Sequence, residues 1–347
     1  MMYFFSLIIS FLLAALFTPL VKKLALKLNI TDQPGPRKIH HQPVALLGGL
    51  AIYLAFTSCL LIFLALGYII DVKISGLQVL GIVTAVSILI IGGILDDIYN
   101  LKPAQQIIFP LLAVSITVLF GVKIQFVTNP FGGYLNFPLY TGVIFAFFWL
   151  LGMIYTTKFL DGLDGLVSGV TSIGSIIIFI VSLSWDVANS GTSYLALILA
   201  GSCLGFLIFN WHPAKIFLGE GGSVFCGYML GVLSIISGSK IATALLIMGI
   251  PILDVAWVII RRLIQGKSPI GADRKHLHFR LLDIGLSHRQ AVLFLYSATA
   301  AFGLTSLFLH SRGKLIALFL LLLFMVVLAA GLFYIYQKKQ THGHKKI

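Results

Sequence analysis

Apolar runs long enough to cross a lipid bilayer are the feature that most constrains how this chain can fold. A membrane-spanning helix needs about 20 consecutive apolar residues, because the hydrocarbon core of a bilayer is about 30 Å thick. Hydrophobic residues make up 59% of the 347 residues, more than the single core of a soluble domain accommodates. We therefore predict an all-α integral membrane protein with about eleven transmembrane helices, over residues 3–21, 45–70, 76–95, 104–121, 140–157, 166–185, 193–211, 222–238, 240–260, 289–310 and 314–336.

The first apolar run could be a cleaved secretory signal or an uncleaved first helix. A signal peptide carries basic residues before its apolar stretch. Here the basic residues, Lys22 and Lys23, follow the run instead. Because basic residues gather on the cytoplasmic side of membrane proteins, this order predicts an uncleaved helix with the N-terminus outside. With eleven spans, the C-terminus is then cytoplasmic.

The formal net charge of +13 first suggests a protein that binds nucleic acid. The positions of the basic residues argue against that class. In the predicted topology all but five lysines and arginines fall in cytoplasmic segments, and the exceptions are Lys73, Lys123, Lys240, Arg312 and Lys314. This distribution is the ordinary bias of membrane proteins, so it supports the predicted orientation and we expect no nucleic-acid partner.

The chain shows no soluble domain and no repeat of fixed period. We predict one polytopic membrane domain over residues 1–336 and a polar cytoplasmic tail over residues 337–347. Between two apolar runs, residues 122–138 (VKIQFVTNPFGGYLNFP) alternate apolar and polar side chains around a Gly-Gly pair. That pattern predicts a short β-hairpin, which the topology places on the exterior side.

Acidic residues are scarce, and their positions are informative. The chain has only 11, and in the predicted topology all but Asp71 and Asp186 lie at the cytoplasmic face. Acidic residues contribute little to topology, and carboxylates at membrane depth are costly. Their gathering on one face therefore indicates a functional site. The clusters are Asp96 with Asp97, Asp161 with Asp164, and Glu220.

Each cluster has a local sequence that suits a cation site. Asp96 and Asp97 are adjacent, so their charges repel unless a cation or a shared proton relieves them. Asp161 and Asp164 lie three residues apart in FLDGLDGL, so a helical turn would place both on one face. Glu220, the only glutamate, lies between glycines in FLGEGGS. Carboxylate oxygens favour Mg²⁺ or Mn²⁺, and Mg²⁺ is usually bound together with substrate phosphates.

Other interpretations of these residues exist. Asp96, Asp161 or Asp164 alone could cap the helix that follows it. The spacing in DGLDG excludes an EF-hand loop, which needs an alternating series of ligands. GEGG is not a dinucleotide-binding loop, because no βαβ unit surrounds it. The convergence of three clusters on one face favours a shared site over separate helix caps.

Basic and histidine side chains on the same face could bind phosphate. Arg and Lys form charge-assisted hydrogen bonds with phosphate oxygens. Among His, Arg and Lys in RKHLHFRLL, His276 and His278 are more suited to an anion or to proton transfer than to a metal cation. The basic candidates are Arg37, Lys38, Lys215, Arg274, Lys275 and Arg280.

Five motifs, in order along nearly the whole chain, resemble those of the polyprenyl-phosphate N-acetylhexosamine-1-phosphate transferases, glycosyltransferase family 4. They are DQPGPRKIHHQPVALLGG, GGILDDIYNL, FLDGLDGL, NWHPAKIFLGEGGS, and PILDVAWVIIRR followed by SPIGADRKHLHFRLLDIGLSHRQ. The H-L-H-x-R-L form resembles the branch that uses UDP-N-acetylglucosamine or a related UDP-sugar. The resemblance implies transfer of a sugar-1-phosphate from a UDP-sugar to undecaprenyl phosphate, with release of UMP, as the first membrane step of a cell-envelope glycan.

The resemblance also implies partners and a location. The partners are undecaprenyl phosphate, a UDP-N-acetylhexosamine and the lipid bilayer, and a homodimer is left open. The cofactor is Mg²⁺, with Mn²⁺ as the alternative. The protein would lie in the bacterial inner (cytoplasmic) membrane with its active site facing the cytoplasm.

Roles for individual residues follow from the same resemblance. Asp96 would orient or deprotonate the lipid phosphate, with Asp97 beside it. Asp161 and Asp164 would shape the nucleotide-sugar and metal site, and the metal would be held by Glu220 and Asp164. Phe217 would stack on uracil, and phosphates or sugar would contact His276, His278 and Arg280.

The chain departs from the family pattern at a few positions. The family has Asp at the position of Glu220 and Asn at the positions of Tyr155 and Lys158, and Phe279 replaces a third histidine. On a continuing helical turn Lys158 could pair with Asp161 and compete with the metal, or it could bind phosphate itself. From the family pattern we predict that Glu220→Asp retains or raises the Mg²⁺-dependent rate.

Two functional classes follow from these departures. The four retained aspartates favour an active transferase, whereas Lys158 and Glu220 favour a diverged, weakly active relative that binds lipid phosphate or nucleotide-sugar. A secondary transporter fits less well, since its charged residues would lie near the bilayer midplane on broken helices.

Overall fold

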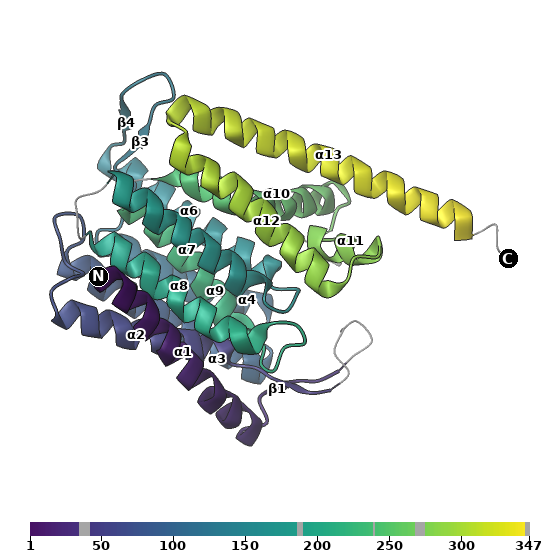
Figure 1. Ribbon diagram of the computed structural model, residues 1–347, viewed down its shortest axis with the longest axis horizontal. Helices are drawn as coiled ribbons and strands as arrows, with labels where there is room; N and C mark the ends of the chain where they lie inside the picture. The colour runs from purple at the N-terminus through teal and green to yellow at the C-terminus, as the bar shows by residue number, and fades with distance from the viewer. Residues whose placement is uncertain (35–41, 186–189, 239, 268–274, 344–347) are drawn as a thin grey trace.

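Ten long apolar helices form the body of the protein (Figure 1). The computed structural model describes residues 1–34, 42–185, 190–238, 240–267 and 275–343. All but one of the predicted apolar runs form a single helix long enough to cross a bilayer. These helices are α1 (Met2–Lys27), α2 (Gly48–Ala65), α3 (Gly76–Tyr99), α6 (Leu139–Leu160), α7 (Leu166–Trp185), α8 (Gly191–Asn210), α9 (Gly219–Ile236), α10 (Ile241–Ile264), α12 (His288–Phe308) and α13 (Ser311–Gly343).

The remaining run, predicted over residues 104–121, is shorter than a full span. It is divided into α4 (Pro103–Gln106) and α5 (Ile108–Leu119). Together these cover Pro103–Leu119 and are interrupted at Ile107, whereas each of the ten long helices is continuous over at least 18 residues. The helix ends before the apolar run does, because Gly121 adopts a φ of 95° and turns the chain away. The described residues therefore contain ten helices of spanning length, where about eleven were predicted.

The predicted hairpin is confirmed. Strands β3 (Phe126–Thr128) and β4 (Tyr134–Asn136) pair antiparallel, with Gly-Gly in the connecting turn. The Arg312 guanidinium donates to the Pro130 carbonyl at 3.0 Å, which ties the hairpin to the start of α13. The hairpin therefore marks one end of the helix bundle (Figure 1).

A pair of short strands and a short helix, which the sequence did not predict, lie toward the opposite end (Figure 1). Strands β1 (Thr31–Asp32) and β2 (Val44–Ala45) pair antiparallel, and Ala45 also bridges to Ile216 in the link between α8 and α9. The short helix α11 (Leu277–Asp283) precedes α12. These elements bring the links between the long helices together at this end.

Basic residues are distributed between the two ends as the predicted topology requires. The five basic residues that were not predicted to be cytoplasmic all lie at the hairpin end. Lys73 is in the α2–α3 link, Lys123 lies between α5 and β3, Lys240 precedes α10, and Arg312 and Lys314 are in the first turn of α13. The other described lysines and arginines of the links lie at the opposite end. The predicted tail begins within a helix, because α13 continues to Gly343.

Small residues let the central helices approach each other closely. In α9, every residue from Gly221 to Ile236 is buried. A Cβ on Gly201 of α8 would lie 2.1 Å from Ser10 Oγ, and one on Gly205 would lie 2.3 Å from the Phe11 carbonyl oxygen. This spacing of small residues is typical of helix pairs in membranes, where close backbone contact stabilises packing.

Glycines also set the approach of α9 to α2 and α3. A Cβ on Gly49 would lie 2.2 Å from the Gly222 nitrogen, and one on Gly93 would lie 2.1 Å from Gly221 Cα. The glycines that follow Glu220 therefore serve helix packing. This packing brings the C-terminal end of α3, with Asp96 and Asp97, next to the N-terminal end of α9.

Replacing Gly93 by Ala is expected to lower the stability of the protein by about 1–3 kcal/mol, since the added methyl meets backbone that cannot turn aside. Thermal unfolding in detergent would measure this as a lower midpoint. The matched control is Gly152→Ala, because a Cβ there meets no atom within 4 Å. An unchanged midpoint in Gly93→Ala would show that the contact between α3 and α9 is looser than described.

Candidate active site

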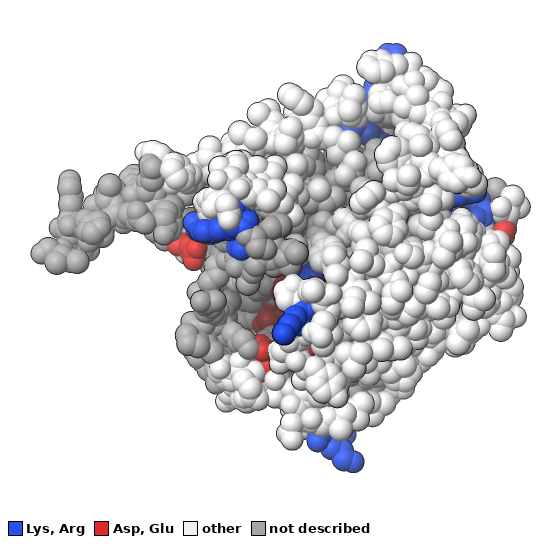
Figure 2. Space-filling model, turned by 180° about the vertical axis from the view of Figure 1, so that it is seen from behind, with Lys and Arg blue, Asp and Glu red and all other residues white. Residues whose placement is uncertain are grey.

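A large pocket opens at the end of the bundle opposite the β3–β4 hairpin. Its volume is about 1090 Å³. In Figure 2 acidic side chains are visible inside a hollow of the surface, next to basic ones. Six acidic residues and three lysines line the pocket: Asp32, Asp96, Asp97, Asp161, Asp164, Glu220, Lys22, Lys158 and Lys215. The three acidic clusters of the sequence therefore share one pocket.

The adjacent aspartates at the end of α3 have separate hydrogen-bond partners. Asp96 Oδ1 accepts from the Leu101 backbone N–H at 2.8 Å and from the Gln106 amide at 2.9 Å. Asp97 Oδ1 accepts from the Glu220 backbone N–H at 3.1 Å, at the N-terminus of α9. Hydrogen bonds to each carboxylate thus offset the repulsion that adjacency predicts.

Lys158 pairs with Glu220 and not with Asp161, so one of the two possibilities that its spacing left open does not occur. The Lys158 Nζ lies 2.5 Å from Glu220 Oε1 and donates to Gln106 Oε1 at 2.9 Å. Gln106 in turn holds Asp96, so a continuous polar chain joins α3, α4, α6 and α9. Asp161 is the C-terminal cap of α6, where its backbone N–H still donates to the Thr157 carbonyl at 3.1 Å, but its ψ of 61° takes the chain out of the helix. The Lys158 side chain is turned toward the start of α9, which carries Glu220.

Two of the departures from the family pattern, Lys158 and Glu220, therefore contact each other. The Lys158 ammonium also lies 6.0 Å from the centre of the Tyr155 ring, at the limit of a cation–π contact. Both members of the ion pair are largely shielded, with about a fifth of each side chain exposed (19% and 21%). Lys158 and Glu220 therefore form one partly buried ion pair.

Asp161 and Asp164 lie in the turn between α6 and α7, not on one helical face. Gly165 has a φ of 80°, which a residue with a side chain adopts only with strain. Asp164 Oδ2 lies 2.7 Å from His212 Nδ1 and accepts from the Ala214 backbone N–H at 3.1 Å. Asp164 therefore binds the α8–α9 link, and Asp161 is left facing the pocket.

The environment of Asp161 favours its protonated form. Burial by surrounding protein and the carboxylates of Glu220, Asp97 and Asp164 raise its pKa to about 8. The side chain is nevertheless exposed to solvent through the pocket, and all four causes shift its pKa in the same direction. Asp161 has no hydrogen-bond or ion-pair partner among the described residues, and a cation would stabilise its charged form.

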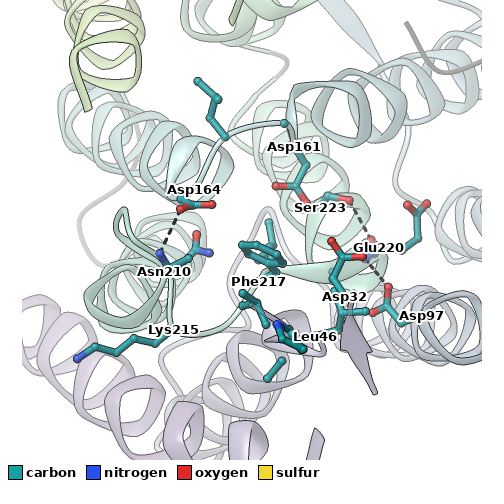
Figure 3. Close-up of a pocket in the computed structure, with 18 of the residues that line it drawn as sticks. Asp32, Leu46, Asp97, Asp161, Asp164, Asn210, Lys215, Phe217, Glu220 and Ser223 are labelled. Atoms are coloured by element: carbon teal, nitrogen blue, oxygen red, sulfur yellow. Dashed lines mark hydrogen bonds between the residues drawn. The ribbon is translucent and has the colours of Figure 1, made fainter. Parts of the chain in front are cut away.

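Figure 3 shows the labelled side chains around the Phe217 ring. In that view Asp161, Asp32 and Asp97 lie on one side of the ring, and Asp164 and Lys215 lie on the other. The Phe217 backbone N–H donates to the Ala45 carbonyl at 2.8 Å, which fixes the loop that carries the ring. Phe217 and Lys215 thus line the pocket at positions where a planar base and a phosphate could bind.

The predicted histidines and Arg280 do not line the pocket described here. His276 Nδ1 lies 2.8 Å from Asp254 Oδ2, and both residues are buried. His278 is 1% exposed and packs against Gly162, where a Cβ would meet its Nε2 at 2.1 Å. The Arg280 Nε–H donates to the Lys275 carbonyl. His278 therefore supports the turn that carries Asp161.

Of the other predicted phosphate-binding residues, Lys275 is exposed and does not line the pocket, whereas Arg37, Lys38 and Arg274 lie outside the described residues. Several pocket residues were not predicted as site residues: Lys22, Asp32, Asn210, His212 and His288. Two of these residues lie in the family-like motifs of the sequence. Asp32 opens the motif DQPGPRKIHHQPVALLGG, and His212 belongs to NWHPAK. Nothing in their spacing distinguished them from ordinary loop residues.

The His278 environment predicts a dependence of stability on pH. Burial lowers its pKa from 6.5 to about 3, with smaller effects of His276 and His288. The unfolded chain binds a proton at His278 below pH 6.5 and the folded protein does not, so stability falls as pH decreases from 6.5. The slope is at most about 1.4 kcal/mol per pH unit. Unfolding midpoints at pH 7.5 and 5 should differ less in His278→Leu than in the unchanged protein.

The control for this experiment is His310→Leu, which removes an exposed histidine at the hairpin end. Its midpoint should fall with pH as in the unchanged protein. An equal fall in His278→Leu would show that His278 is not held neutral in the fold.

Comparison with known proteins gives a consistent result. The model of glycosyl transferase family 4 matches residues 79–238. The chain is 34% identical to a Bacillus subtilis protein named probable undecaprenyl-phosphate N-acetylglucosaminyl 1-phosphate transferase, covering 93% of this chain and 90% of that one. It is 32% identical to a Mycolicibacterium smegmatis decaprenyl-phosphate N-acetylglucosaminephosphotransferase, over 85% and 79% of the two chains. A Thermotoga maritima undecaprenyl-phosphate alpha-N-acetylglucosaminyl 1-phosphate transferase is 27% identical, over 86% and 87%.

Proposed function

Because this chain belongs to glycosyl transferase family 4, the polyprenyl-phosphate N-acetylhexosamine-1-phosphate transferases, we propose that it transfers N-acetylglucosamine 1-phosphate from UDP-N-acetylglucosamine to undecaprenyl phosphate. An oxygen of the lipid phosphate attacks the phosphorus that carries the sugar. The bond from that phosphorus to UMP breaks, and UMP leaves with the electron pair. The product is a lipid-linked sugar diphosphate.

The observation that carries this proposal is one pocket, at the end of a membrane bundle, that combines acidic residues, lysines and an aromatic ring. A lipid phosphate reaches such a pocket from the membrane surface, and a nucleotide reaches it from water. The ring of Phe217 offers a stacking surface for uracil. Lys215 and Lys22 offer ammonium groups for phosphate oxygens.

The charge balance of the pocket supports a requirement for divalent metal. Six acidic side chains face three lysines, and both substrates are anionic. Glu220 does not fit the role of metal ligand that the family pattern implied, because the Lys158 ammonium already lies against its carboxylate. The unpartnered carboxylate of Asp161 fits that role, with Asp97 and Asp164 nearby. Mg²⁺ bound there would neutralise phosphate charge and favour attack at phosphorus.

The described contacts suggest different roles for the four aspartates. Asp161 would hold the metal, and Asp97 would hold the N-terminus of α9 beside it. Asp96 would act mainly by positioning Gln106 and, through it, Lys158. Asp164 would fix the α8–α9 link that carries Lys215 and Phe217.

We further propose that the protein resides in a bacterial cytoplasmic membrane with the pocket facing the cytoplasm. The ten apolar helices support a multi-pass membrane protein. Because the five exceptional basic residues gather at the hairpin end, the positive-inside rule assigns the pocket end to the cytoplasm. The position of the carboxylates at one end of the bundle also disfavours a transporter, whose charges would lie near the midplane.

The test uses purified full-length protein in detergent with undecaprenyl phosphate and separate UDP-N-acetylhexosamine donors. UMP release would be followed with Mg²⁺, with Mn²⁺ and with EDTA. Metal-dependent release with UDP-N-acetylglucosamine supports the proposed reaction, and release with another donor corrects the sugar. No release from folded protein with any donor would overturn the proposal and favour a relative that only binds these substrates.

A further inference from the structure

We propose that Asp164, His212 and His288 form a binding site for a divalent transition-metal ion of the Zn²⁺ and Co²⁺ class. This site goes beyond the proposed transferase function, and its occupancy can be measured without turnover. Its three residues come from three separate segments: the α6–α7 turn, the α8–α9 link and the first residue of α12. All three border the large pocket.

The first observation is the distance between potential ligand atoms. One side-chain nitrogen or oxygen from each residue lies within 4.8 Å of the other two. His212 Nδ1 lies 2.7 Å from Asp164 Oδ2. The His212 and His288 rings stack with centres 3.9 Å apart and planes inclined by 12°. Two imidazoles and one carboxylate thus meet at one point of the pocket wall.

The second observation is that His288 lacks hydrogen-bond partners. Both of its ring nitrogens are buried, and neither makes a hydrogen bond of good geometry with a described residue, although the Asp164 backbone lies nearby. A neutral imidazole has one N–H and one lone pair, and leaving a buried polar group unsatisfied costs about 1–3 kcal/mol. A structural histidine in this position would be expected to bind a carbonyl or carboxylate. A metal ion would instead accept the lone pair.

The types of ligand indicate the class of metal. Two nitrogens and one carboxylate oxygen suit Zn²⁺, Co²⁺ and related ions, whereas Mg²⁺ favours oxygen ligands only. Three protein ligands leave a further position toward the pocket, where water or a phosphate oxygen could bind. In tetrahedral geometry ligand atoms lie about 3.3 Å apart and each nitrogen lone pair lies in the plane of its ring. The stacked rings must therefore rotate by tens of degrees out of their parallel arrangement before both can bind one ion.

The surrounding contacts would support such a site. The Ala214 backbone N–H donates to Asp164 Oδ2 at 3.1 Å. The Arg289 guanidinium donates to the His212 carbonyl through Nε at 3.1 Å and Nη2 at 2.9 Å. Such contacts beyond the ligands orient them and strengthen metal binding. A bound ion would add a further connection among three segments of the pocket wall that these hydrogen bonds already hold together.

The test is a titration of the metal-free, full-length protein in detergent with Co²⁺, read by visible absorption, with an affinity tag that contains no histidine. The variants are His288→Ala and His212→Ala. The matched control is His310→Ala, at the hairpin end. All proteins keep the histidines of the C-terminal segment, so binding there contributes equally and the difference between variants reports the site.

We expect the unchanged protein and His310→Ala to bind one Co²⁺ that both pocket variants bind at least about 100-fold more weakly, because losing a ligand costs more than losing a supporting contact. X-ray absorption of the Zn²⁺-loaded protein should show imidazole ligands whose number falls in His288→Ala. Equal Co²⁺ binding by the unchanged protein and by variants with unaltered unfolding midpoints would overturn the site. If His288→Ala unfolds, His288→Gln is used in its place. The same number of imidazole ligands in Zn²⁺-loaded His288→Gln and in the unchanged protein would also overturn the site. UMP release is assayed separately, so failure of the transferase and failure of this site are distinguishable.

Discussion

Replacing Asp161 by Asn is expected to lower the rate of UMP release about 100- to 1000-fold, the usual effect of removing one fixed electrostatic group from an active site. The fold does not depend on this side chain, because it has no hydrogen-bond or ion-pair partner among the described residues. Its carboxylate faces the other acidic groups of the pocket and is the one best placed to hold a metal. UMP release at saturating Mg²⁺ measures the effect. The unfolding midpoint should not fall, because the neutral amide removes a charge that burial and the neighbouring carboxylates disfavour.

Two other variants make this prediction specific. Asp283→Asn changes an exposed aspartate outside the pocket and should leave the rate unchanged. Asp96→Asn should be milder than Asp161→Asn, since the amide oxygen can still accept from Leu101 and Gln106. If Asp161→Asn keeps its rate within threefold while Asp96→Asn loses it, the roles assigned to the two residues must be exchanged.

Single substitutions of Lys158 and Glu220 are expected to impair the enzyme more than the double substitution does. Lys158→Asn leaves Glu220 without its counter-ion among other carboxylates, and Glu220→Asp withdraws the carboxylate from Lys158 by one methylene. We expect each to lower the rate of UMP release about 10-fold, an effect within the range that small displacements in an active site produce. The double variant, Lys158→Asn with Glu220→Asp, restores the family pattern at these two positions. It should recover most of the rate.

The coupling free energy between the two substitutions, obtained from the four rates of UMP release, decides whether Lys158 and Glu220 compensate each other. Contacting residues show coupling of about 0.5–3 kcal/mol in double-mutant cycles, and we expect a value near the upper end. The double variant should also reach its half-maximal rate at a lower Mg²⁺ concentration, since an acid freed of its ammonium becomes a possible metal ligand. Additive losses would contradict the compensation between Lys158 and Glu220. From sequence, Glu220→Asp was expected to retain or raise the rate, and the observed ion pair reverses that expectation.

The long helices were predictable because the signal is local. An apolar run of about 20 residues in a membrane has few alternatives to a helix, since unpaired backbone groups are too costly there. The run at residues 104–121 shows the limit of this rule. Its composition predicts a full span, whereas the positive φ of Gly121 ends the helix early. The elements β1, β2 and α11 are too short to leave a pattern of their own.

The site was predictable as a set of acidic residues but not as a set of contacts. The scarcity of carboxylates and their placement at helix ends indicated which residues would gather, and the pocket contains all three clusters. Sequence spacing offered Asp161 or a phosphate as partner of Lys158 and did not indicate Glu220, because Glu220 is 62 residues away along the chain. Only the packing of α6 against α9 brings the two side chains together.

The sequence by itself determined the membrane class, the long helices, the hairpin and the end of the bundle at which the acidic residues gather. Only the tertiary structure decided which of these residues touch. Gly93 and Gly221 allow α3 and α9 to meet, which brings Asp97 to the Glu220 backbone. The stacking of His212 on His288 depends in the same way on how two distant links pack. Such contacts depend on the packing of whole helices, and no local pattern of residues records it.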